Sequence, residues 1–198
     1  MSSSRFGPGD TDFFDRFADL YDLVMPSARI DPLRGGFAFA HRQVDRVVDL
    51  AGGTGRASAG LTAAGFDPVV VDRSAGMLRR ARAAGHPTVR GDAETLPLRD
   101  DAVDAVVVVD ALHHFPDPES GLAEAYRAIG PGGVVVIQEF DPESYRGRGL
   151  VAAEGLVGFD STFWEPAALC DRLAAAGFEP RIVSEGFEYV VVGRVPRS

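Results

Sequence analysis

The stretch from Val47 to Arg56 constrains the fold more than any other part of this chain. It begins with the apolar run Val-Val-Asp-Leu, continues through Ala-Gly-Gly-Thr-Gly and leads into a helical pattern over residues 57–64. A short, continuous apolar run is typical of a buried parallel strand. Glycines let the backbone turn tightly beside a ligand, and the following helix directs its free N–H groups back at the turn. The stretch therefore predicts a nucleotide-binding turn at the carboxyl end of a strand, although the motif alone is equally typical of an ordinary tight turn.

Length and composition indicate one globular domain. The chain has 198 residues, of which 45% are hydrophobic and 25% are charged. The single cysteine, Cys170, excludes an internal disulfide framework and suits a reducing compartment. No apolar run approaches the roughly 20 residues that cross a bilayer, and the first residues lack the apolar core of a signal peptide. We therefore expect a soluble, cytoplasmic protein with no transmembrane segment.

The charge balance argues against a nucleic-acid partner. The net charge is −9, and all 20 basic residues are arginine. Binding to phosphate backbones needs a basic surface. We therefore expect a small-molecule partner and no nucleic acid.

Strand and helix patterns alternate along most of the chain. Strands are predicted at residues 44–50, 68–72, 87–90, 103–109, 133–140, 180–185 and 188–195. Helices are predicted at residues 12–24, 37–42, 57–64, 74–84, 118–129 and 165–176. This alternation predicts an α/β, doubly wound, mostly parallel seven-stranded sheet with helices on both faces. The last two strands have only Gly186 and its neighbours between them, so they form a hairpin. The last strand therefore runs antiparallel to its neighbour and gives the sheet an antiparallel edge.

Acidic residues follow two of the predicted strands. Asp72 ends the second strand 17 residues after Gly55, where a carboxylate can accept hydrogen bonds from both ribose hydroxyls of a nucleotide. The alternative is that Asp72 caps the helix that starts near Ser74. Asp92, after the third strand, can accept a hydrogen bond from an adenine amine, or it belongs to an ordinary Gly-Asp turn.

The ordered combination of motifs resembles the class I S-adenosylmethionine-dependent methyltransferases of the small-molecule type. The resemblance covers about residues 44–195. The matching elements are Asp49–Gly55, Asp72, Asp92–Ala93, Leu96–Leu98, Asp110–Phe115, Ile129–Gly133 and the terminal hairpin. Within the family, the Ala-Gly-Gly-Thr-Gly turn and the Gln138–Pro142 segment are similar to the ubiquinone/menaquinone C-methyltransferases.

This sequence departs from the family pattern at three places. Ala51 stands where the wider family has its first glycine, although the quinone branch shares this alanine. Gly130 stands where lysine is common. The chain is also short between the fifth strand and the helix near Glu165, which trims the substrate cap and puts quinone specificity in doubt.

The resemblance implies a Rossmann-like methyltransferase fold, S-adenosylmethionine as cofactor and S-adenosylhomocysteine as product. It implies residues 1–43 as an N-terminal helical lid and residues 44–198 as the cofactor-binding domain. The implied cofactor residues are Asp49, Ala51, Gly52, Gly53, Gly55, Ser58, Asp72, Arg73, Met77, Asp92, Ala93, Val109 and Asp110. In this set Asp49 and the turn hold the methionine portion, and Met77 either packs on adenine or belongs to the core. We expect no metal ion.

His113 is the candidate catalytic base, needed only if the acceptor loses a proton. It follows the fourth strand, and histidine titrates near neutrality. The alternative is a packed histidine, which is the preferred interpretation of His114.

Aromatic residues flank the predicted site on two sides. They are Phe13, Phe14, Phe17 and Tyr21 on the first helix, and Phe159, Phe163 and Trp164 after the fifth strand. They either close over an acceptor or belong to the core. If they line a pocket, the acceptor is a small apolar or aromatic molecule, such as a quinol-like phenol.

Three other functions remain open from the sequence. An NAD-linked oxidoreductase is disfavoured because Ser58 replaces the third glycine of the dinucleotide fingerprint. A non-catalytic module that binds S-adenosylmethionine fits the cofactor motifs equally well. A methyltransferase acting on protein or nucleic acid is the third, and the acidic charge disfavours the nucleic-acid substrate.

Overall fold

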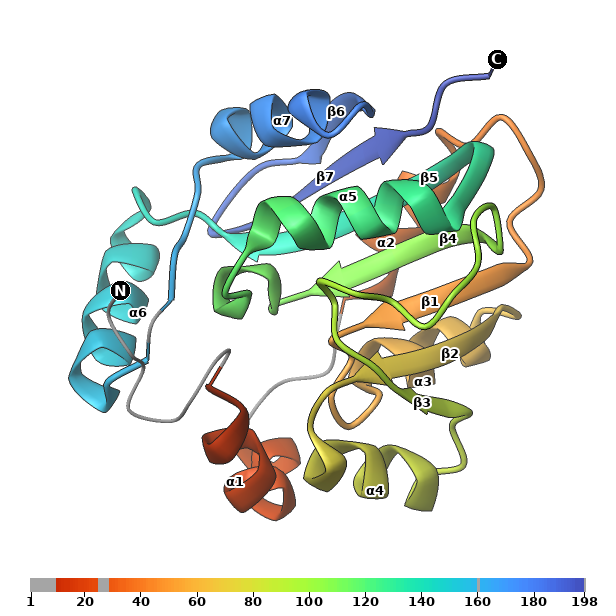
Figure 1. The fold of residues 1–198 in the computed structure, drawn as a ribbon. Helices are drawn as coiled ribbons and strands as arrows, with labels where there is room; N and C mark the ends of the chain where they lie inside the picture. The colour runs from red at the N-terminus through yellow and green to blue at the C-terminus, as the bar shows by residue number, and fades with distance from the viewer. Residues whose placement is uncertain (1–9, 25–28, 160, 198) are drawn as a thin grey trace.

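A seven-stranded sheet runs through the middle of the molecule, with helices packed on both of its faces (Figure 1). The computed structural model describes residues 10–24, 29–159 and 161–197. The strands are β1 Arg46–Leu50, β2 Asp67–Asp72, β3 Thr88–Arg90, β4 Val103–Val109, β5 Ile129–Phe140, β6 Glu179–Ser184 and β7 Glu188–Arg194. The helices are α1 Thr11–Val24, α2 Ile30–Phe37, α3 Arg56–Ala63, α4 Ala75–Ala83, α5 Pro118–Ala128, α6 Tyr145–Val157 and α7 Pro166–Ala175, with the short 3₁₀ helix η2 Leu112–His114.

The strand order is β3-β2-β1-β4-β5-β7-β6. Strands β1 to β5 are mutually parallel, and β7 is antiparallel to both of its neighbours, β5 and β6. The doubly wound sheet with an antiparallel last strand is therefore confirmed. The terminal hairpin forms one edge of the sheet, with β6 as the outermost strand and β7 between β6 and β5.

The core has one layer on each side of the sheet. Val47 packs on the side of α2 and α3, whereas the adjacent Val48 packs on the side of α5 and α7, as the alternation of a strand requires. Leu61 of α3 and Leu173 of α7 are fully buried on opposite sides. Burial of each such side chain contributes about 1.5–3 kcal/mol. Burial on both faces explains why the central strands have continuous apolar sequences.

Two helices differ from the sequence prediction. Helix α2 covers residues 30–37 rather than 37–42. Pro32 fits its first turn, where the missing N–H costs nothing, and Gly36 lies so close to β5 that a Cβ would be 2.7 Å from Val136. Helix α6 was not predicted: it carries three glycines and exposes Tyr145 and Leu156, so its sequence has no apolar stripe.

Helix α1 packs against the start of α4. The Asp15 carboxylate accepts hydrogen bonds from the Gly76 N–H, at 2.8 Å, and from the Ser74 hydroxyl. A Cβ at Gly76 would lie 2.7 Å from the Asp15 carbonyl oxygen, so the two helices approach closely because this residue is glycine. These contacts place the first turn of α1 beside the carboxyl ends of β1 and β2 (Figure 1).

No helix in the described part of the chain is both long enough and apolar enough to cross a membrane. The cytoplasmic location stays a prediction.

Candidate functional site

A pocket opens at the carboxyl ends of β1, β2 and β4, and it encloses about 900 Å³, counting space open to solvent. All but two of the predicted cofactor residues line it, namely Asp49, Ala51, Gly52, Gly53, Asp72, Arg73, Met77, Asp92, Ala93, Val109 and Asp110. The other two do not line the pocket: Gly55 ends the glycine turn as the N-cap of α3, and Ser58 donates hydrogen bonds to Asp49.

Asp49 is fully buried at the floor of the pocket. Its Oδ2 accepts hydrogen bonds from the Ser58 N–H, at 3.0 Å, and from the Ser58 hydroxyl, at 2.7 Å. Its Oδ1 has no hydrogen-bond partner among the described residues. A Cβ at Gly52 would be 2.5 Å from the carboxyl carbon, so only glycine fits above this group. Burial raises the pKa of Asp49 to about 6.

The glycine turn has three residues in the left-handed region. They are Ala51, Gly53 and Gly55, with φ of 53°, 57° and 87°. Gly55 is the N-cap of α3, and a Cβ there would be 2.7 Å from the His86 ring. The turn is also held from β2, because the Gly53 N–H donates to Asp72 Oδ2 at 2.9 Å.

The positive φ of Ala51 leads to a stability prediction. Ala51→Gly is expected to raise the free energy of unfolding by about 1 kcal/mol, because the left-handed conformation costs a non-glycine residue about 1–2 kcal/mol. The greater freedom of glycine in the unfolded chain offsets part of this gain. Urea unfolding measures the change. The control Ala59→Gly, at an exposed position inside α3, is expected to lower stability by about 1 kcal/mol. Equal destabilisation by both variants would contradict the prediction.

Two carboxylates at the ends of β2 and β3 line the pocket: Asp72 is the last residue of β2, and Asp92 follows β3 by two residues. Asp72 accepts the Ser74 N–H at 2.7 Å as well as that of Gly53, and burial raises its pKa. Both proposed roles of Asp72 are therefore compatible, since it supports the start of α4 and also faces the pocket. Asp92 forms an ion pair with Arg73, at 2.8 Å, and accepts the N–H of Glu94.

The Asp110 carboxylate lines the pocket directly after β4 and has two polar partners. Asp110 Oδ2 lies 3.4 Å from Arg56 Nη2, and its Oδ1 accepts a hydrogen bond from the Gln138 side chain at 3.1 Å. Burial raises the pKa of Asp110. Sequence reasoning did not identify Arg56 as a site residue. The available signal was its position as the first helical residue after the glycine turn, where a side chain points back toward the strand ends.

The two histidines of η2 have different surroundings. His114 lines the pocket, whereas His113 does not and is only 2% exposed. Burial opposes protonation of His113, but the Glu139 carboxylate, 2.7 Å from Nδ1, raises its pKa above the usual value. Burial lowers the pKa of His114, whose Nδ1 lies 3.1 Å from Asp10 Oδ2. The catalytic role of His113 stays a prediction. Of the two histidines, His114 is the one that lines the pocket.

The predicted aromatic residues separate into a cluster at the pocket and residues packed elsewhere. The ring centroids of Phe13 and Phe159 are 4.8 Å apart, and those of Phe14 and His114 are 5.1 Å apart, so the two flanking groups are in contact. Phe14 and His114 of this cluster line the pocket. Phe163 stacks on His113 at 4.4 Å, and Trp164 lies in the core. The predicted lid side chains of residues 17 and 21 lie outside the described part of the structure.

The family model and the curated relatives that this chain matches are all described as methyltransferases. A model described as "Methyltransferase domain" matches residues 48–137. A demethylmenaquinone methyltransferase of Clavibacter sepedonicus is 45% identical over 101 residues, which cover 48% of this chain and 41% of that protein. Another from Beutenbergia cavernae is 37% identical over 163 residues, which cover 78% of this chain and 66% of that protein. The chain spans about half the length of several curated relatives that it matches.

Solved structures share the fold. An S-adenosylmethionine-dependent methyltransferase from Thermotoga maritima superposes with a TM-score of 0.76 at 26% identity, covering 93% of this chain and 98% of that one. The 4+2 cyclase SpnF superposes with a TM-score of 0.71 at 15% identity over the full length of both chains. The second similarity concerns the fold alone, and it shows that this architecture also serves a protein named for another reaction.

Proposed function

This chain belongs to the class I S-adenosylmethionine-dependent methyltransferases, and we propose that its pocket binds this cofactor for methyl transfer to a small apolar or aromatic acceptor. The family and the fold imply the cofactor. The individual contacts, the acceptor and the lid role of residues 1–43 are our proposals.

The observation that carries the proposal is the unpartnered, buried oxygen of Asp49 beneath Gly52. An amino-acid ammonium group placed above the glycine turn supplies the partner that this oxygen lacks. Arg56, which also lines the pocket, can attract the carboxylate of the same amino acid. The charge arrangement thus fits the methionine portion of the cofactor. The Asp72 carboxylate and the Met77 and Ala93 side chains provide a polar and an apolar surface for the nucleoside.

The cofactor supplies an electrophilic methyl group on a sulfonium and leaves as the neutral S-adenosylhomocysteine. The chain's own contribution is therefore mainly alignment and exclusion of water, and alignment is worth roughly 7–11 kcal/mol in well-oriented reactions. The carboxylates of Asp49 and Asp110 on one side and the aromatic cluster on the other define the path between cofactor and acceptor.

The aromatic cluster of Phe13, Phe14, His114 and Phe159 supports an apolar or aromatic acceptor. The relatives named demethylmenaquinone methyltransferases support a quinol-like phenol as the first acceptor to test. The acidic charge of the protein supports a small molecule over a nucleic acid.

We expect Phe159→Ala to raise the KM for a quinol-like acceptor at least fivefold, because Phe159 contacts both Phe13 and His114 at the proposed acceptor side. The affinity for S-adenosylhomocysteine is expected to stay within twofold, since Phe159 does not line the cofactor pocket. Methyl-transfer kinetics and calorimetry measure the two quantities. Tyr145→Ala, which removes a ring exposed to 97%, is the control. An unchanged acceptor KM would assign Phe159 to packing only.

Transfer of a labelled methyl group to a panel of phenols and quinols tests the function as a whole. Turnover with at least one acceptor supports the enzyme. Tight cofactor binding without turnover on any acceptor, including protein extracts, would favour the non-catalytic module instead.

A further inference from the structure

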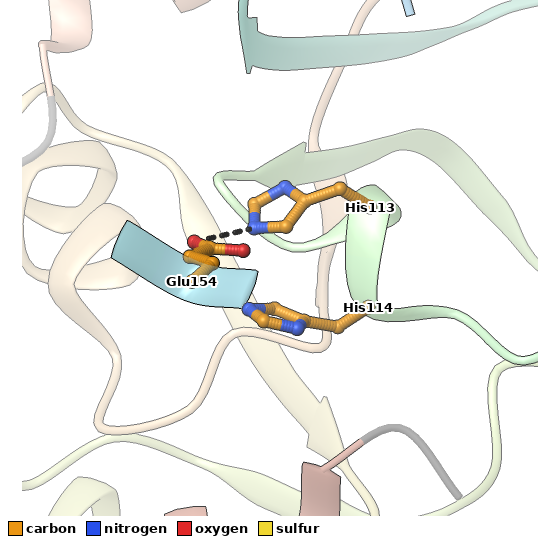
Figure 2. Close-up of side chains that lie close together, drawn as sticks. All are labelled: His113, His114 and Glu154. Carbon is orange, nitrogen blue, oxygen red and sulfur yellow. Dashed lines mark ion pairs between the residues drawn. The ribbon is translucent and has the colours of Figure 1, made fainter. Parts of the chain in front are cut away.

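We propose that His113, His114 and Glu154 bind a divalent transition-metal cation, such as Zn²⁺, at the acceptor side of the pocket (Figure 2). Two histidines and one carboxylate are a common ligand set for Zn²⁺ and for non-haem iron. Metal binding at this place is independent of the proposed methyl transfer and goes beyond the family assignment.

The three side chains come from two segments far apart in the sequence and point toward one another. The histidines lie on η2, after β4, and Glu154 lies on α6 with its carboxylate toward both rings (Figure 2). One ligand atom of each residue lies within 4.8 Å of the other two, and His113 Nε2 is 3.8 Å from Glu154 Oε1. A cation about 2.1 Å from each ligand needs separations of roughly 3.4 Å, so small side-chain movements complete the site.

Each histidine is held by a second carboxylate on its other ring nitrogen. Nδ1 of His113 is 2.7 Å from Glu139 Oε2, and Nδ1 of His114 is 3.1 Å from Asp10 Oδ2. Histidine ligands of metals characteristically donate their second ring N–H to a carboxylate, which fixes the ring and leaves the other nitrogen for the metal. Both rings therefore have the orientation of metal ligands, with Nε2 available to the cation.

Three carboxylates in and beside the cluster, those of Asp10, Glu139 and Glu154, also favour the binding of a cation. Glu139 and Asp10 are 2% and 1% exposed, and Glu154 Oε2 is buried without a hydrogen-bond partner among the described residues. An isolated buried carboxylate oxygen is costly. A divalent cation between Glu154 and the two rings would provide the missing partner and offset the negative charge.

The site has a position left for a further ligand. Three protein ligands leave a tetrahedral cation one open position, as in catalytic zinc sites. His114 lines the pocket, so the open position lies near the proposed acceptor side. A role in holding an acceptor oxygen rests on the proposed function, whereas the binding of the cation does not.

Calorimetric titration of the metal-stripped full chain with ZnCl₂ tests the proposal. We expect one Zn²⁺ per chain and at least tenfold weaker binding in Glu154→Gln, which keeps the shape of the side chain. His114→Gln is expected to have a similar effect and provides a second variant if the first alters α6. Glu143→Gln removes an exposed carboxylate at the start of the same region and is expected to bind as the unaltered chain does.

A second readout identifies the ligands. Co²⁺ in place of Zn²⁺ is expected to give visible absorption bands that disappear in His114→Gln, and circular dichroism checks the fold of each variant. No binding by the unaltered chain, or binding that neither Glu154→Gln nor His114→Gln weakens, would overturn the metal site. Because S-adenosylhomocysteine is titrated separately, that result would leave the proposed function standing, and loss of S-adenosylhomocysteine binding alone would leave the metal site standing.

Discussion

Asp49→Asn is expected to weaken binding of S-adenosylhomocysteine about a hundredfold while it stabilises the unliganded protein. Asparagine removes the negative charge that faces the proposed ammonium position, and a hydrogen bond to a charged group contributes about 1.5–3 kcal/mol. An asparagine oxygen can still accept the two hydrogen bonds that Ser58 donates. The fold is therefore expected to remain intact, and calorimetry is the direct measurement.

The stability effect depends on pH in a defined direction. Burial raises the pKa of Asp49 from 3.8 to about 6, so the folded protein prefers the neutral carboxyl. This preference favours folding below pH 3.8 and is lost as the pH rises through about 6. At pH 7.5 the ionised carboxylate is the costly form, and Asp49→Asn is expected to raise stability by up to about 3 kcal/mol, at about 1.4 kcal/mol per pKa unit.

The same pKa predicts a pH dependence of binding. Affinity of the unaltered protein for S-adenosylhomocysteine is expected to fall as the pH drops below about 6, where Asp49 becomes protonated. Asp49→Asn is expected to lose this dependence. If the variant binds as tightly as the unaltered protein at pH 7.5, Asp49 is a structural group and the methionine portion lies elsewhere.

Asp72→Ala is expected to weaken S-adenosylhomocysteine binding at least tenfold with the fold intact. The side chain lines the pocket at the end of β2 and also orders the backbone of Gly53 and Ser74. Its loss removes the acceptor for the ribose hydroxyls and loosens the glycine turn. Asp100, an exposed carboxylate that forms an ion pair with Arg127, provides a matched control. No change in affinity is expected for Asp100→Ala.

Ligand analogues separate the two effects of Asp72→Ala. The unaltered protein is expected to prefer adenosine over 2′,3′-dideoxyadenosine, and the variant is expected to bind both equally weakly. A variant that keeps the preference would show that Asp72 acts through the turn and not through the ribose. An unchanged affinity for S-adenosylhomocysteine would remove Asp72 from the site.

The pocket was predictable because its residues follow strand ends at regular places in the chain. Asp49, Asp72 and Asp110 each lie at or directly after the end of a buried strand, and parallel strands bring these ends to one edge of the sheet. The apolar runs of β1 and β4 identify the central strands for the same reason.

The acceptor side was not predictable to the same degree, because its contacts are long-range. Helix α6 has no apolar stripe, so nothing in its sequence indicates that Glu154 faces η2. The aromatic residues were identified as a group, but only the structure separates Phe159, which packs on His114, from Trp164 in the core. Their shared apolar character cannot distinguish a lid from core packing.

Calorimetric titration of the folded chain with S-adenosylhomocysteine and with NAD, side by side, tests the central claim most directly. We predict binding of one S-adenosylhomocysteine per chain and no binding of NAD, because Ser58 occupies the place of the third glycine and donates to Asp49. Binding of NAD alone, or of neither ligand by a folded protein, would contradict the proposed cofactor and the enzymatic function with it.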